Sequence, residues 1–261
     1  MEEYKFNEAS EALYQFVWHE YCDWYLELIK PRLYGADPEA RAAVKAMAFR
    51  VLEHALRLLH PFVPFITEEL WQILKPLGVV EEDAASISQT RYPGVDASWI
   101  DETLEAEVVK FQKIVYTVRN IRGELSIAPS ARTTVEFKIQ DGPDEWFLKK
   151  YYPHMTTLVN INEELLAGKD LEPHPASSVG LVDGCEIRVL WPAEVEEMEI
   201  KRLRKQIEQL EAAIASRGKK LGNEAFTARA PREVVEKECE RFEAEKQEHE
   251  RLSRQLALLV K

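Results

Sequence analysis

The stretch Ile200–Ile214, IKRLRKQIEQLEAAI, decides the architecture of the C-terminal quarter of this 261-residue chain. Apolar side chains recur in it at intervals of three and four residues, at Ile200, Leu203, Ile207, Leu210 and Ile214. Lys, Arg, Glu and Gln fill most of the other positions. This spacing is typical of the seam of a coiled coil.

A second helix of similar length is expected after a break. The break contains Gly218, Gly222 and Pro231, residue types that interrupt helices. The apolar pattern then resumes at Val235, Phe242, Leu252, Leu256 and Leu259. Polar residues hold the seam positions between them: Glu238, Glu245 and His249. The pattern predicts an antiparallel coiled-coil hairpin over residues 194–261, an arm of roughly 35–40 Å at 1.5 Å per residue.

Residues 1–100 have the pattern of a helical bundle. Apolar residues at helical spacing predict three helices, over residues 7–29, 40–59 and from Pro61 or Pro64 to Leu74. Asp37 and Pro38 suit the N-cap and first position of the second helix. Pro31 is expected to end the first helix, and a loop without apolar periodicity is expected over residues 78–97.

Residues 101–193 predict a long helix followed by a small α/β module. The helix is expected over residues 100–122, with Gly123 as a left-handed cap. Arg119 and Arg122 would complement the negative end of its dipole or contact phosphates. Alternating or β-rich runs predict strands over residues 135–139, 178–182 and 185–190, and a short helix is expected near residues 144–151. The Asp183-Gly184 pair between the last two strands is typical of a hairpin turn.

These patterns together predict a mainly α fold with three domains. They are the helical bundle, 1–100, the helix with the mixed α/β subdomain, 101–193, and the antiparallel coiled-coil arm, 194–261.

The charge of the chain limits what it can bind. The net charge is -12, which excludes general nucleic-acid binding through bulk positive charge. Residues 1–103 carry 9 basic and 18 acidic residues, whereas residues 194–261 carry 15 of each. A polyanion must therefore meet a local basic patch. Three distant cysteines, no run of 18 apolar residues and no signal-peptide pattern at the start predict a cytoplasmic protein without a membrane span.

Catalytic and metal-binding signatures are missing from the sequence. It contains no Gly-rich phosphate loop, paired Cys-x-x-Cys, His-Glu-x-x-His or Gly-x-Ser-x-Gly motif. His19 and Cys22 lie one turn apart on a helix, but two ligands make a weak metal site. We therefore assign no catalytic residue, no metal site and no cofactor to the chain itself.

The turn of the predicted hairpin is the best binding signal. Its candidate RNA-contacting residues are Arg217, Lys219, Lys220, Asn223, Phe226 and Arg229. Cations at the end of a stiff arm suit phosphates, and Phe226 suits stacking on a splayed base. The spacing supports equally well a second interpretation, in which Leu221 and Phe226 only close the hairpin and the charges are solvated.

Two strings in the bundle and two in the hairpin resemble class I aminoacyl-tRNA synthetases. The bundle strings, Phe16–Glu27 (FVWHEYCDWYLE) and Leu58–Trp71 (LLHPFVPFITEELW), are similar to the anticodon-binding domain shared by the valine, isoleucine and leucine enzymes. The hairpin strings, Lys220–Phe226 (KLGNEAF) and Ala230–Val235 (APREVV), are similar to the C-terminal coiled coil of valyl-tRNA synthetases. The resemblance covers almost the whole chain.

The resemblance implies a division of labour on a valine-specific tRNA. The bundle would read the anticodon loop, with Phe16, Lys30, Arg32 and Arg50 as candidates, and the hairpin tip would contact the outer corner of the tRNA. In the family, a catalytic domain with HIGH and KMSKS signatures, which uses ATP and Mg, and an editing domain precede this region. Neither signature is present here, so a C-terminal fragment, inactive alone, is expected. We also expect a monomer that contacts its own catalytic domain in the full-length chain and binds no DNA.

The resemblance also bears on apolar surface in the bundle. A helix that the family has upstream of Asn7 is missing, so part of the first helix should be uncovered. In the second string, Phe62, Phe65, Ile66, Leu70 and Trp71 are expected to be buried.

Two other functions remain open at this point. The hairpin could be a scaffold whose polar seam residues, Glu238, Glu245 and His249, bind an outside helix of another protein. Alternatively, the chain could be a free-standing paralogue that binds tRNA in trans.

Overall fold

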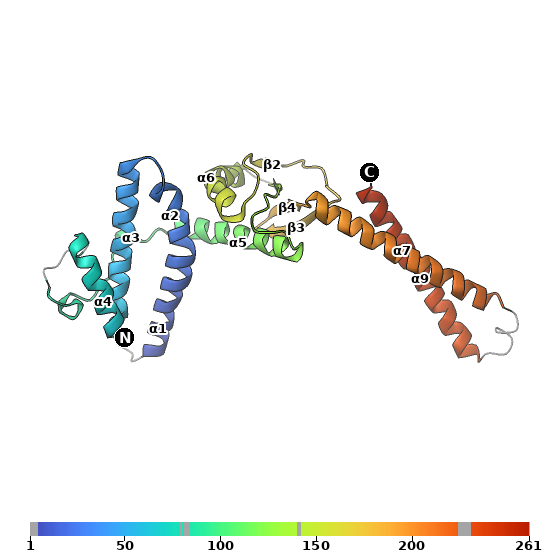
Figure 1. Ribbon diagram of the computed structural model, residues 1–261, viewed down its shortest axis with the longest axis horizontal. Coiled ribbons are helices and arrows are strands. Elements are labelled where there is room, and N and C mark those ends of the chain that lie inside the picture. The colour runs from blue at the N-terminus through green and yellow to red at the C-terminus, as the bar shows by residue number, and fades with distance from the viewer. Residues whose placement is uncertain (1–4, 79, 81–83, 140–141, 224–230, 261) are drawn as a thin grey trace. The chain divides into compact units, whose positions relative to one another are not determined.

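The structure, a computed structural model, describes residues 5–78, 80, 84–139, 142–223 and 231–260. The chain divides into two compact units, Met1–Asp101 and Glu102–Lys261 (Figure 1). Helices dominate both units, and the second also contains a four-stranded sheet. The mainly α fold with a small α/β module is thereby confirmed. The further division of the second unit into two domains stays a prediction.

The first unit consists of a long helix, two further helices and short 3₁₀ turns. The elements are α1 (Phe6–Gln15), the π-helical segment η1 (Phe16–Tyr25), α2 (Leu26–Leu33), α3 (Pro38–Leu59), α4 (Pro64–Leu74), η2 (Lys75–Leu77), η3 (Ile87–Gln89) and η4 (Ala97–Trp99). α1, η1 and α2 follow one another without a break. The prediction that Pro31 ends this helix is wrong. Proline removes one N–H donor, but the helix continues to Leu33 and the Tyr34 amide bonds to the Lys30 carbonyl at 2.9 Å.

The predicted start of α3 is confirmed. The Asp37 carboxylate accepts hydrogen bonds from the amides of Glu39 at 2.9 Å and Ala40 at 3.3 Å, and Pro38 takes the first helical position. Residues of α3, α4 and the following loop then share one core cluster, formed by Leu56, Trp71, Leu74, Ala84 and Ile87. The segment predicted as a plain loop therefore contributes Ile87 to the core.

The predicted burial of the Leu58–Trp71 string is wrong for most of its apolar residues. Trp71 is fully buried, but Phe65 is 91% exposed, and Ile66 and Leu70 are also exposed. The buried positions Thr67, Trp71 and Leu74 form one face of α4. Ile66, Leu70 and Ile73 follow a separate helical stripe on its exposed side, which Leu77 of η2 extends. Both sides of α4 are apolar, and within the described structure only one is covered.

The second unit combines a sheet, two covering helices and the C-terminal hairpin. Its elements are α5 (Glu102–Glu124), β1 (Val135–Lys138), α6 (Gly142–Val159), β2 (Leu166–Gly168), β3 (Ser177–Val182), β4 (Cys185–Leu190), α7 (Ala193–Leu221) and α9 (Arg232–Leu259). The strand order is β2-β1-β4-β3, parallel between β1 and β2 and antiparallel elsewhere. Asp183 and Gly184 have φ of 46° and 85°, which confirms the tight turn between β3 and β4. β2 and the full length of α6 were not predicted.

Helices α5 and α6 cover one face of the sheet. Phe137 and Ile187 are paired on this face and fully buried, and Phe137 packs edge-on against Tyr152 of α6. Gly180 of β3 brings the sheet close to α5, because a Cβ at this position would lie 2.3 Å from Thr117 Cγ2. Only glycine allows this approach.

Gly180→Ala should therefore destabilise the protein by about 1–3 kcal/mol, the usual cost of overpacking a core. Denaturant unfolding measures the change. Gly123→Ala is the matched control, because Gly123 lies in α5 and a methyl group added there would meet nothing within 4 Å. This control should leave stability unchanged or raise it by up to about 1 kcal/mol. Equal effects of the two changes would contradict the steric argument.

The end of α5 differs from the prediction in two respects. Gly123 lies inside the helix without a positive φ, and the left-handed residue is Ser126, at φ 54°. Arg122 is not a solvent-facing partner of the helix dipole. Its side chain is buried and donates hydrogen bonds to Thr133 Oγ1 and to carbonyl oxygens of the loop that leads into β1.

Candidate nucleic-acid interface

The C-terminal hairpin consists of α7 and α9, which run antiparallel side by side (Figure 1). Near its base the seam is apolar and packs on the α/β part of the unit. Leu203, Leu252 and Leu259 are buried together with Ala176, and Trp191 packs against this cluster. The predicted antiparallel hairpin is confirmed for the described residues, and its base is anchored by apolar contacts.

Further along the hairpin the seam is ionic. Arg217 donates two hydrogen bonds to Glu245, from Nε and Nη2 at 2.9 Å each, and one from Nη1 to Glu238 at 2.5 Å. Lys220 Nζ donates to the other oxygen of Glu238 at 3.1 Å. The side chains of Arg217 and Glu238 are 20% and 14% exposed. We call these four residues, Arg217, Lys220, Glu238 and Glu245, the ionic layer.

The ionic layer changes the acidity of its carboxyls. Hydrogen bonds from Lys220 and Arg217 lower the pKa of Glu238, and the hydrogen bonds from Arg217 lower the pKa of Glu245. The two carboxylates in turn raise the pKa of Arg217. His249 Nε2 lies 3.2 Å from Glu211 Oε1 across the hairpin. The polar seam residues thus have partners within the hairpin, which removes the observation that favoured an outside helix.

The predicted tip residues fall into three groups. Lys219, Lys220 and Asn223 are exposed near the end of α7, and Lys219 forms no ion pair with any described residue. Arg217 lies in the ionic layer, so its first partners are Glu238 and Glu245, and its contact with RNA stays a prediction. Phe226 and Arg229 lie outside the described residues.

Two exposed cations of α9 were missed by the sequence reasoning. Lys237 and Arg241 lie one turn apart, within the first ten residues of α9. They do not stand out in the sequence, because the acidic neighbours Glu236, Glu238 and Glu240 offset their charge when the net charge of the segment is counted.

The four anticodon candidates are exposed but do not form one cluster. Phe16 and Lys30 are separated by 14 residues of one continuous helix, roughly 20 Å. Lys30 pairs with Glu27 at 2.5 Å, and the Arg50 guanidinium lies 5.0 Å from the ring centre of Trp99. Arg32 is exposed near the end of α2. Their contact with an anticodon stays a prediction.

The first helix has the exposed apolar surface that was expected. Tyr14 and Trp18 are exposed and stack with ring centres 6.3 Å apart and planes within 5°. Phe16 is also exposed. These aromatic side chains are available for contact with a partner.

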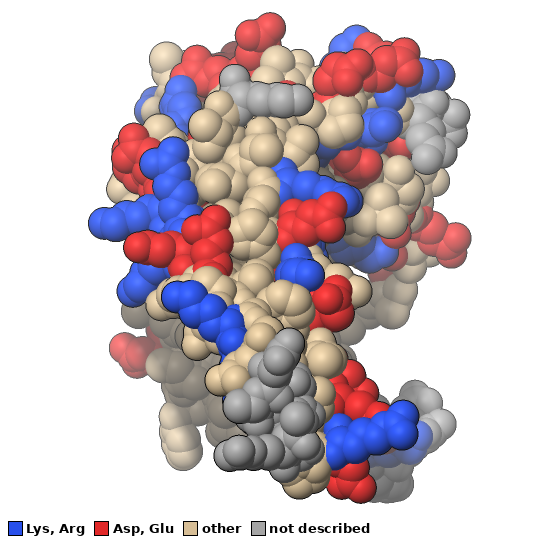
Figure 2. All heavy atoms as spheres, turned by 90° about the vertical axis from the view of Figure 1, so that its right-hand side faces the viewer, with Lys and Arg blue, Asp and Glu red and all other residues tan. Residues whose placement is uncertain are grey.

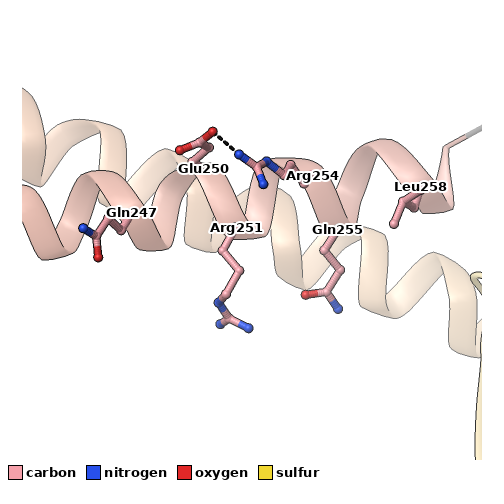
Figure 3. Close-up of a pocket in the computed structure, with 6 residues that line it drawn as sticks. All are labelled: Gln247, Glu250, Arg251, Arg254, Gln255 and Leu258. Carbon is pink, nitrogen blue, oxygen red and sulfur yellow. Dashed lines mark hydrogen bonds and ion pairs between the residues drawn. The ribbon is translucent and has the colours of Figure 1, made fainter.

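Over the face drawn in Figure 2, Lys and Arg side chains alternate with Asp and Glu. A hollow of about 360 Å³ on α9 illustrates the same pairing (Figure 3). Its two cations both have acidic partners, Arg251 with Glu248 at 2.6 Å and Arg254 with Glu250. Within the described ranges, no helix could span a membrane and no group of three potential metal ligands gathers.

Comparison with known families agrees with this geometry. The anticodon-binding domain of tRNA ligases matches residues 1–137, and the tRNA binding arm of valyl tRNA synthetases matches residues 195–260. The chain belongs to the family of anticodon-binding domains of tRNA ligases. The second match coincides with the hairpin of α7 and α9.

Within this class the chain is similar to valine–tRNA ligases. It is 37% identical to that of Syntrophotalea carbinolica over 246 residues, which cover 93% of this chain and 26% of the relative. It is 37% identical to those of Neisseria meningitidis, over 91% of this chain and 24% of the relative, and Geobacter sulfurreducens, over 93% and 27%. The resemblance to valyl-tRNA synthetases is confirmed, and the chain spans about a quarter of the length of these relatives.

Proposed function

We propose that this chain is the tRNA-recognition part of a valine–tRNA ligase. The hairpin tip contacts the outer corner of a valine-specific tRNA, and the first unit contacts its anticodon loop. The complete ligase joins valine to the tRNA at the expense of ATP, whereas this part supplies position and selectivity. A monomeric state and a cytoplasmic location remain part of the proposal.

One observation supports the proposal most directly. Lys219 and Lys220 are exposed near the end of a hairpin that matches the tRNA binding arm of valyl tRNA synthetases. The base of this hairpin is fixed by Leu203, Leu252 and Leu259. A fixed arm can present cations as a local group, so that phosphates meet positive charge on a chain whose net charge is -12.

Charge reversal at the tip tests the proposal. Lys219→Glu combined with Lys220→Glu should weaken binding of valine tRNA at least ~10-fold in a filter assay at low salt. The slope of log K against log salt should fall by about 1.4–1.8, because two phosphate contacts are lost. The control is Arg251→Glu with Arg254→Glu, which makes the same change in charge away from the tip and, like the loss of the Lys220–Glu238 pair in the tip variant, breaks ion pairs within the hairpin. Unchanged affinity in the tip variant would contradict the tip assignment.

A further inference from the structure

The side of α7 that faces away from the seam carries a second group of cations. Lys201, Arg204 and Lys205 are exposed near the base of the hairpin, at spacings of three and four that place them on one helix face. None of them forms an ion pair with a described residue. Glu197 and Glu208 lie one turn to either side and bound the group.

The neighbouring cations on the hairpin behave differently. Arg202 pairs with Glu199 at 2.6 Å, and on α9 Arg251 and Arg254 pair with Glu248 and Glu250. Cations with intramolecular partners must give those up to bind an anion. Lys201, Arg204 and Lys205 would bind one without that loss.

The same face of α7 connects this group to the tip. Residues at alternating spacings of four and three form a stripe, which we call the outer stripe: Lys201, Lys205, Glu208, Ala212, Ala215 and Lys219. Ala212 and Ala215 are exposed and short, so the part of the stripe between Glu208 and Lys219 presents no bulky side chain. Lys205 and Lys219 are 14 residues apart on one unbroken helix, about 21 Å, which fixes their separation.

We propose that Lys201, Arg204 and Lys205 form a second site for phosphates of the RNA backbone, so that the outer stripe lies along a duplex segment of the RNA. This inference rests on the proposed function and extends it from the tip to the length of α7. A span of about 21 Å covers several nucleotide steps of an A-form RNA duplex, enough for contacts with phosphates at both ends. The small residues between let the backbone approach the helix.

The composition of the stripe favours RNA over a protein partner. Four cations, the outer-stripe lysines and Arg204, oppose one carboxylate, Glu208, and the stripe contains no large apolar side chain. Protein interfaces depend on an apolar or aromatic centre, which this face does not offer. Phosphate contacts need only positioned charge.

Neutralisation of the three cations tests the inference. The variant Lys201→Gln, Arg204→Gln, Lys205→Gln should bind valine tRNA ~10-fold or more weakly at low salt. Its slope of log K against log salt should fall by about 2.1–2.7, the value for three lost contacts. Glutamine is a good helix former, so the thermal unfolding curve should not change.

The matched control neutralises three paired cations of the same hairpin. Arg202→Gln, Arg251→Gln, Arg254→Gln makes the same change in net charge and should alter affinity and slope much less. Equal losses in both variants would overturn the site, because net charge alone would then set the affinity. Full affinity in the first variant, together with a loss in the Lys219→Glu, Lys220→Glu variant, would overturn the site and leave the proposed function standing. No loss in either would remove both.

Discussion

Replacement of Arg122 by methionine should lower the free energy of unfolding by about 3–5 kcal/mol, because several buried oxygen acceptors lose hydrogen bonds from a charged donor. The Arg122 side chain holds the loop before β1 through several acceptors. Nη2 donates to the carbonyls of Ala128 and Ala131, each at 2.9 Å, and Nη1 donates to Thr133 Oγ1 at 2.8 Å. Methionine keeps much of the volume but takes the arginine donors away from the Ala131 carbonyl and Thr133 Oγ1, whereas the Ala128 carbonyl still accepts from the Ala131 amide at 2.9 Å.

Arg119→Met is the control for this change. Arg119 lies one turn earlier on α5, is exposed and makes a long hydrogen bond of 3.4 Å to the Leu158 carbonyl. Its replacement should cost no more than about 1 kcal/mol. Denaturant unfolding measures the free energy of unfolding of both variants, provided that its dependence on denaturant concentration has the same slope in each. A difference below about 1 kcal/mol between the two variants would contradict the anchoring role of Arg122.

Replacement of Arg217 by methionine should open the outer half of the hairpin while its base stays folded. The change leaves Glu238 and Glu245 close together without their shared cation. Amide hydrogen exchange should lose at least ~10-fold protection around the ionic layer, and protection around Leu203 and Leu252 should persist. Affinity for tRNA should fall with it, because the tip is no longer held in one geometry.

The pH dependence of this variant should have the opposite sign to that of the native chain. In the native hairpin the pKa values of Glu238 and Glu245 are lowered, so their stabilising effect is complete above about pH 4.5 and is lost as the pH falls through the lowered pKa values. In Arg217→Met, Glu238 keeps its pair with Lys220, whereas Glu245 loses the hydrogen bonds that lowered its pKa. Protonation of Glu245 then removes its repulsion from Glu238, so acid should restore protection.

A rescue variant separates charge from side-chain volume. Arg217→Met combined with Glu238→Leu and Glu245→Leu makes these three positions apolar, while Lys220, whose side chain is 46% exposed, can extend into solvent. The triple variant should protect the hairpin at least as well as the native residues do. Continued loss of protection in this triple variant would contradict the ionic explanation. Lys219→Met, on the outer stripe, should leave exchange unchanged.

The hairpin could be predicted because its signal is local. The spacing from Ile200 to Ile214 and the break before Pro231 are enough to define two paired helices. The turn at Asp183-Gly184 is equally local, since it depends on backbone conformations that few residues adopt. Such features need no knowledge of distant neighbours.

The burial of α4 could not be predicted in this way. Apolar residues lie on both of its sides, and the periodicity does not state which stripe meets α3. Tertiary packing selects Thr67, Trp71 and Leu74 and leaves Phe65 and Ile66 exposed. The sequence pattern predicted a helix here but could not assign its covered side.

The charged residues of the site show the same limit. Arg122 and Arg217 occupy positions where helix ends and tips usually expose cations, so the sequence predicts solvent-facing roles for them. Each instead finds acceptors that are distant in the chain, Thr133 for Arg122 and Glu238 and Glu245 for Arg217. Lys219 has no such acceptor among the described residues, and its exposed position agrees with the prediction.

The uncovered side of α4 has a practical consequence for salt titrations of this protein. The exposed apolar surface there consists of Phe65, Ile66, Leu70, Ile73 and the adjoining Leu77. Salt does not weaken apolar contacts made through this surface, because they do not depend on charge. Strongly hydrated anions such as sulfate promote salting-out by strengthening apolar attraction, whereas they loosen contacts with phosphates. In a sulfate titration, loss of RNA binding would therefore coincide with self-association of the protein. Chloride screens the phosphate contacts without strengthening apolar association to the same degree, so a chloride titration reports RNA binding alone.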